Sequence, residues 1–87
     1  MANHKQAAKR HRQSLVRKSR NRHYKSMLRT ELKRARQAVE ERSDDMNAAV
    51  EKAVQIIDRV ASKGIIPRNS ASRTIGRLRK SHHLAQS

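Results

Sequence analysis

The stretch SDDMNAAVEKAVQIIDRVASKGIIP, residues 43–67, carries the signals that define the fold. Its apolar residues recur at helical spacing and form a broad stripe: Met46, Ala49, Val50, Ala53, Val54, Ile56, Ile57, Val60 and Ala61. A stripe this wide predicts a helix over residues 45–62 that packs against two neighbours. The segment is therefore expected to be the central element of a helical bundle.

Both ends of this helix have recognisable boundary residues. The Ser-Asp-Asp run at 43–45 predicts its start, because short oxygen side chains accept the free backbone N–H groups of a first turn. Gly64 stands where a left-handed cap is expected, and Pro67 prevents the same helix from continuing. Asn69 or Ser70 is then expected to cap a third helix that runs to about residue 84.

The third helix has a short apolar side formed by Ala71, Ile75 and Leu78, with Leu84 near its end. Gly76 in its interior either costs about 1 kcal/mol relative to alanine or allows another backbone to approach closely. The sequence leaves these two explanations open.

Upstream, a stripe of apolar residues again has helical spacing: Tyr24, Leu28, Leu32, Ala35 and Val39. A stripe of basic residues runs beside it, displaced by about 100° around the helix: Lys18, Arg22, Lys25, Arg29, Lys33 and Arg36. The pattern predicts one helix over residues 5–42, about 57 Å long, in which only the second half packs on a core. With two Gly, one Pro and no Cys in 87 residues, we predict an all-α, antiparallel three-helix bundle with an extended N-terminal first helix.

Charge divides the chain into three zones. Residues 1–36 contain thirteen basic residues and one acidic residue, residues 37–60 contain three and six, and residues 61–87 contain six and none. The total of +15 predicts a polyanionic partner, whose phosphates exchange condensed counterions for Lys and Arg. We expect a single domain, 1–87, made of a basic arm (1–23), the bundle (24–84) and a tail (85–87). Because the arm lacks an apolar stripe, we expect it to become ordered only on that partner.

Other functional classes fit the sequence poorly. The acidic residues of the middle zone suit capping and solvated positions, the five His lack metal-ligand spacing, and no glycine-rich phosphate loop is present. We expect no enzymatic activity, no cofactor or metal, no small-molecule substrate and no membrane span. An Arg-rich, acid-poor N-terminus also resembles an organelle transit peptide, although here the basic pattern continues into the bundle.

Charge alone does not distinguish RNA from DNA. Tyr24 is the single aromatic residue, and its place in the apolar stripe favours core packing over base stacking. We therefore expect recognition of the phosphate backbone and of shape. A small DNA-compacting protein and a membrane-active cationic peptide remain alternatives at this point.

Several segments, in order and at matching separations, resemble the bacterial small-subunit ribosomal protein twenty family. They are MANHKQAAKR (1–10), Gln13–Ser14, Arg17, Asn21, SMLRT (26–30), Lys33 and DRVASKGIIPRNSASR (58–73). The resemblance implies a three-helix bundle with a very long first helix. It also implies a monomeric structural component of the cytoplasmic 30S subunit that binds 16S ribosomal RNA directly, early in assembly, and bridges distant RNA segments.

The resemblance and the basic stripes together define a predicted RNA-binding set. Its members are Lys and Arg residues and short polar residues of the first and third zones. They are Lys5, Lys9, Arg10, Arg12, Ser14, Arg17, Lys18, Asn21, Arg22, Lys25, Arg29, Lys33, Arg36, Lys63, Arg68, Asn69, Arg73, Arg77 and Lys80.

Overall fold

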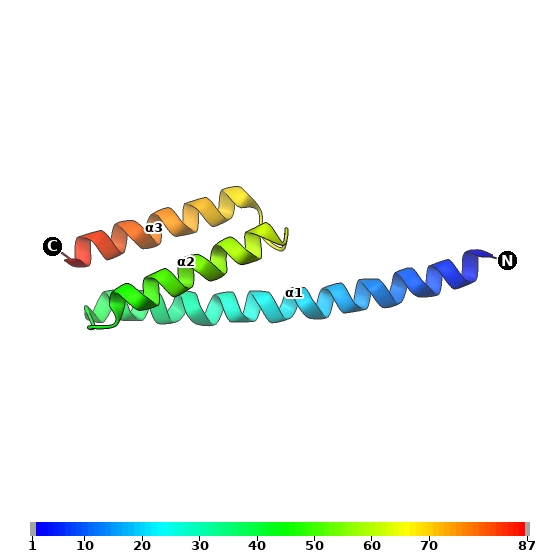
Figure 1. Ribbon diagram of the computed structural model, residues 1–87, viewed down its shortest axis with the longest axis horizontal. Coiled ribbons are helices and arrows are strands. Elements are labelled where there is room, and N and C mark those ends of the chain that lie inside the picture. The colour runs from blue at the N-terminus through cyan, green and yellow to red at the C-terminus, as the bar shows by residue number, and fades with distance from the viewer. Residues whose placement is uncertain (1, 87) are drawn as a thin grey trace.

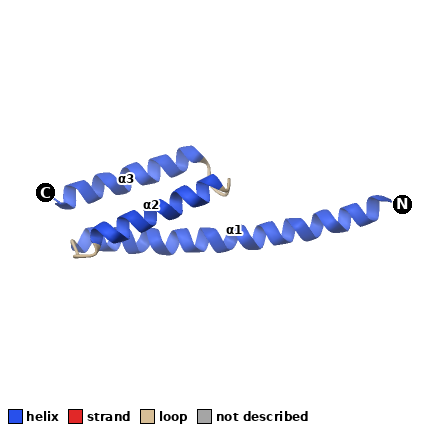
Figure 2. Ribbon diagram, viewed as in Figure 1, coloured by secondary structure: helices blue, strands red, loops and turns tan. Residues whose placement is uncertain are grey.

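The fold consists of three consecutive helices joined by short turns (Figures 1 and 2). The computed structural model describes residues 2–86, with side chains from His4 onward, so that Met1 and Ser87 lie outside the description. Helix α1 spans Ala2–Glu41, α2 spans Met46–Ser62 and α3 spans Arg68–Gln86. Successive helices run antiparallel, and the described residues contain no strand. The predicted all-α class with an extended first helix is confirmed.

Helix α1 is far longer than the bundle it belongs to. Its 40 residues give a length of about 60 Å, and the whole chain extends over 67 Å. The radius of gyration is 17.6 Å, compared with about 12 Å for a compact domain of this length. Helices α2 and α3 lie beside only the second half of α1, and the first half projects alone (Figure 1). Every residue from 4 to 20 is exposed, and partial burial begins at Asn21.

The core lies between the second half of α1, all of α2 and the inner side of α3. It is built from small and β-branched side chains, and Val50, Ile57 and Val60 are the largest of those that are fully buried. Helix α2 supplies more buried residues than either neighbour and contacts both, as its wide apolar stripe predicts. The buried apolar residues are Ala35, Ala38, Val39, Val50, Ala53, Val54, Ile56, Ile57, Val60, Ala71 and Leu78.

Helix α2 ends in a Schellman motif at Gly64, as predicted. The N–H of Ile65 donates to the carbonyl of Val60 (3.2 Å), and the N–H of Gly64 donates to the carbonyl of Ala61 (3.0 Å). Gly64 has φ +74°, a conformation that a Cβ atom disfavours. The two bonds satisfy carbonyls of the last turn and reverse the chain toward α3.

Helix α1 ends with the same pattern, although no glycine marks this position in the sequence. The N–H of Ser43 donates to the carbonyl of Ala38 (3.0 Å), and the N–H of Arg42 donates to the carbonyl of Val39 (3.2 Å). Arg42 has φ +50°, so this motif places a residue with a side chain where glycine is preferred. The left-handed conformation costs about 1 kcal/mol there.

The helix starts differ in detail from the predictions. Asp45 is the N-cap residue of α2, but its side chain forms no capping hydrogen bond and instead accepts from the Ser43 hydroxyl (2.7 Å). Helix α3 begins at Arg68, where the carbonyl of Pro67 accepts from the N–H of Ala71 (3.1 Å). The predicted capping by Asn69 or Ser70 was therefore wrong, because both residues already lie inside the first turn.

Two features of α3 resolve questions left by the sequence. A Cβ added at Gly76 would meet no atom within 4 Å, so no neighbouring backbone of this chain requires glycine there. Leu84, expected on the apolar side, is 60% exposed, whereas Ala85 is partly buried against the core. Ala85 lies seven residues after buried Leu78 and so continues the apolar side of α3, whereas Leu84 points about 120° away from Leu78.

Candidate nucleic-acid interface

The basic stripe on the second half of α1 occupies one side of the helix. At 100° per residue, its six residues fall within an arc of about 80°. All are exposed, and none forms an ion pair within the described residues. We call this surface the α1 basic stripe: Lys18, Arg22, Lys25, Arg29, Lys33 and Arg36.

The N-terminal arm presents its charge differently. Its predicted members up to residue 17 are all exposed and point in many directions around the helix, because no other element covers any side of it. They are Lys5, Lys9, Arg10, Arg12, Ser14 and Arg17. Arg20 lies among them, is equally exposed and was missed, since it falls outside the periodicity of the α1 basic stripe. Its position in a stretch without acidic residues was the sequence signal that could have identified it.

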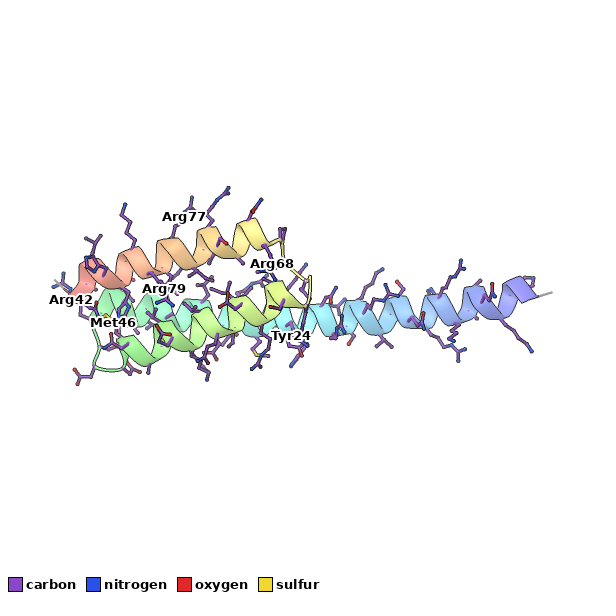
Figure 3. All side chains as sticks on the ribbon, turned by 45° about the horizontal axis from the view of Figure 1, so that its top comes forward. Tyr24, Arg42, Met46, Arg68, Arg77 and Arg79 are labelled. Carbon is purple, nitrogen blue, oxygen red and sulfur yellow. The ribbon has the colours of Figure 1, made fainter. Side chains whose placement is uncertain are left out.

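The remaining predicted residues lie on α3 and on the turn before it. Arg73, Arg77 and Lys80 point about 160° away from the core direction of α3, and Figure 3 shows Arg77 on the outer side of that helix. Lys63, Arg68 and Asn69 are exposed at the α2–α3 turn. These α3 residues form a second basic surface, which we call the α3 outer face (Arg73, Arg77 and Lys80).

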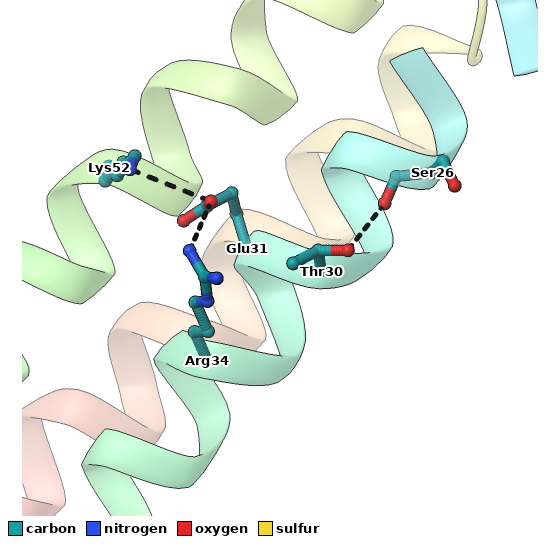
Figure 4. A network of polar contacts seen from close by, with 5 residues as sticks. All are labelled: Ser26, Thr30, Glu31, Arg34 and Lys52. Carbon is teal, nitrogen blue, oxygen red and sulfur yellow. Dashed lines mark hydrogen bonds and ion pairs between the residues drawn. The ribbon is translucent and has the colours of Figure 1, made fainter. Parts of the chain in front are cut away.

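The cations that the fold pairs with carboxylates are all absent from the predicted set. Glu31 is buried between α1 and α2, where it accepts from Arg34 Nη1 (3.1 Å) and lies 3.7 Å from Lys52 Nζ (Figure 4). Arg79 Nη1 lies 3.2 Å from Glu51 Oε1 and so links α3 to α2. These are the ion pairs found in residues 4–86, and all three use cations from outside the set. The predicted cations thus have no carboxylate partner among the residues that the structure describes.

Four of the seven acidic residues lie at the α1–α2 turn, directly after the end of the α1 basic stripe. Glu40 and Glu41 end α1, and Asp44 and Asp45 follow in the turn to α2. Lone Glu31 lies about 160° around α1 from the centre of the α1 basic stripe. The molecule therefore has an acidic end at the α1–α2 turn and a basic first helix.

Two residues of the predicted RNA-binding set, Lys63 and Asn21, also contact or lie partly within the bundle. Lys63 Nζ lies 5.1 Å from the centroid of the Tyr24 ring, a cation–π contact that connects the α2–α3 turn to α1. Tyr24 is half-buried and also meets the His23 ring edge-on, outside the buried core. Asn21 is half-buried, and its Oδ1 is buried without a hydrogen-bond partner in the described part of the chain.

Histidine near the C-terminus serves the fold. His82 forms a hydrogen bond through Nε2 with Asn47 Oδ1, which also accepts from Gln86 Nε2 (3.1 Å). These contacts connect the end of α3 to the start of α2. A contact between residues 35 positions apart cannot be predicted from local spacing.

The described residues offer little for other chemistries. Within residues 2–86 no group of three or more His, Cys, Asp or Glu is placed to hold a metal ion. None of the helices in that part of the chain has both the length and the apolar character needed to cross a bilayer.

Comparison with known proteins identifies the family. The family model described as Ribosomal protein S20 matches residues 2–83, nearly the whole chain. The chain belongs to the ribosomal protein S20 family. This is a family of structural, non-enzymatic ribosomal proteins, and the resemblance noted in the sequence is confirmed.

Individual relatives agree over most of their length, and each is named small ribosomal subunit protein bS20. The protein of Desulfatibacillum aliphaticivorans is 48% identical over 81 residues, covering 92% of either chain. The protein of Sorangium cellulosum is 48% identical over 85 residues, covering 98% of this chain and 90% of the relative. The protein of Trichlorobacter lovleyi is 47% identical over 81 residues, covering 92% and 93%. The S20 family likeness thus extends from the arm through α3.

Proposed function

We propose that this protein is a structural component of the small ribosomal subunit that binds 16S ribosomal RNA directly. Its S20 family membership supports the place in the small subunit. Direct contact with the RNA is the step that we add, through the α1 basic stripe, the arm and the α3 outer face. We infer that it acts as a monomer in the ribosome, in the cytoplasm, without a small-molecule substrate.

One observation carries the proposal: the predicted RNA-binding cations have no carboxylate partner inside the described chain. The ion pairs involve Arg34, Lys52 and Arg79. None of these three residues belongs to the predicted RNA-binding set. Unpaired cations on exposed surfaces are available for phosphate oxygens, and each contact made releases condensed counterions.

The mechanism is that of a cationic brace. RNA helices that pack together in a subunit repel each other through their phosphates, and a protein that neutralises both sides lowers this repulsion. A helix about 60 Å long reaches RNA segments that a compact domain of this size would not reach. The bundle holds the α1 basic stripe in one direction, and the arm offers charge on all sides.

The test compares Arg77→Ala with Arg79→Ala, two substitutions on the same helix. Arg77 is unpaired on the α3 outer face, whereas Arg79 is paired with Glu51. Binding to transcribed 16S ribosomal RNA is measured over a series of salt concentrations. Arg77→Ala should weaken binding and reduce the salt slope by about one unit, and Arg79→Ala should leave that slope unchanged. Equal effects of the two substitutions would contradict the proposed surface.

The same titration discriminates against a DNA-compacting protein. Duplex DNA of matched length is added at the same moderate salt. We expect the affinity for the ribosomal RNA to exceed the affinity for the duplex DNA. The reason is that the long α1 and the α3 outer face can contact separate segments of a folded RNA, which a short duplex does not offer. Equal affinity for both polymers would favour the DNA-compacting alternative.

A further inference from the structure

Two apolar side chains are exposed in the middle of the basic arm. Leu15 is 52% exposed and Val16 is 67% exposed, and no other part of the described protein covers them. Three or four positions away on either side, every residue is polar or charged: His11, Arg12, Gln13, Lys18, Ser19 and Arg20. Leu15 and Val16 thus form an isolated apolar spot on a cationic surface.

This spot lacks what a membrane or a protein groove requires. A helix that lies on a bilayer or docks in a hydrophobic groove presents apolar residues at spacings of three, four and seven. Leu15 and Val16 point about 100° apart, and neither has an apolar neighbour one turn away. No continuous apolar face exists on this part of α1.

The surrounding charge selects the occupant. Residues 1–30 contain no acidic residue, so charge complementarity at the spot favours an anionic partner. A shallow depression at Val16 is also lined by Arg12, Gln13 and Arg17, so that two cationic residues border the apolar spot. Nucleic acid matches this alternation, because riboses and base edges lie between its phosphates. The wide minor groove of RNA displays both at its surface.

We propose that Leu15 and Val16 pack against the riboses and base edges of RNA while neighbouring Arg12 and Arg17 contact the flanking phosphates. The inference rests on the proposed function and adds a contact that is not electrostatic. Burying apolar surface releases no counterions, so its contribution is the same at every salt concentration. The spot would set the position of the arm along the groove, which charge alone leaves free.

The experiment uses the full chain with the double substitution Leu15→Gln/Val16→Thr. Net charge is unchanged, side-chain size is nearly retained, and helix propensity is close to that of the original residues. Binding to transcribed 16S ribosomal RNA is measured over a salt series. We expect affinity about tenfold lower at every salt concentration, with an unchanged salt slope. The matched control Leu15→Met/Val16→Ile, which keeps both positions apolar, should retain the original affinity.

A third variant separates this inference from the proposed function. Arg17→Ala should reduce the salt slope by about one unit if the arm binds phosphates. If that slope falls while the double variant binds like the original protein, the apolar contact is refuted and the proposed function stands. If neither variant changes binding, phosphate contact by the arm fails as well. Binding to phosphatidylglycerol vesicles that disappears in Leu15→Gln/Val16→Thr would overturn the RNA assignment in favour of a membrane.

Discussion

The same substitution at the two glycines should change stability in opposite directions. Gly64 has φ +74° in the turn after α2, and an added Cβ would meet no atom within 4 Å. Alanine there is disfavoured by backbone conformation alone, by about 1–2 kcal/mol, partly offset by the lower entropy of the unfolded chain. We expect Gly64→Ala to lower the free energy of unfolding by about 1 kcal/mol.

Gly76→Ala is the matched control. Gly76 lies inside α3 with ordinary helical backbone, and its added Cβ would likewise meet nothing within 4 Å. Alanine should therefore raise the free energy of unfolding by about 0.8–1.0 kcal/mol through helix propensity. For a domain of this size, 1 kcal/mol corresponds to about 4–8 °C in Tm. Thermal unfolding followed by far-UV circular dichroism should place the two variants on opposite sides of the original protein.

Arg42 extends the same reasoning to the end of α1. Arg42→Gly should raise Tm, because glycine adopts φ +50° without the steric cost that Arg42 bears. Arg42→Ala removes the same charge but keeps a Cβ, so it should bring little gain. The reasoning would be refuted if Gly64→Ala and Gly76→Ala shifted Tm in the same direction, or if Arg42→Ala stabilised as much as Arg42→Gly.

Three further predictions concern the buried carboxylate, the arm and the acidic side of the molecule. Glu31→Gln should lower the free energy of unfolding by about 1 kcal/mol, because it removes charge-assisted contacts to Arg34 and Lys52. The effect is small because both partners are well exposed. Urea unfolding measures it, and an unchanged midpoint would contradict a stabilising role for the Glu31 carboxylate. Without RNA, residues 5–20 should exchange their amide protons quickly, because nothing packs on them. Strong protection of these amides in the free protein would contradict the prediction that the arm becomes ordered only on RNA. Asp58→Ala should leave the affinity for 16S ribosomal RNA within about twofold of the original, as measured by filter binding. A larger change would indicate that α2 takes part in the interface.

Helical periodicity was sufficient to predict the three helices and the place of α2 between two neighbours. The apolar stripe of α2 is too wide for one contact, and burial of Val54 and Ile56 beside Val50 and Ile57 agrees with that prediction. The separation of charge along the chain was equally visible, since acidic and basic residues are counted without a structure. Both features are local, because a helix repeats its facing direction every 3.6 residues wherever it lies.

The candidate site was only partly predictable for the same reason. Which cations remain free depends on contacts between helices: Lys52 reaches Glu31 across the α1–α2 interface, and Arg79 reaches Glu51 across 28 positions. His82 meets Asn47 because α3 packs back along α2.

These pairings follow from how each helix is rotated about its axis within the bundle. Local spacing specifies which residues share a face. The rotation depends on how small side chains such as Ala35 and Ala53 fit together, and that becomes known only when all three helices are packed.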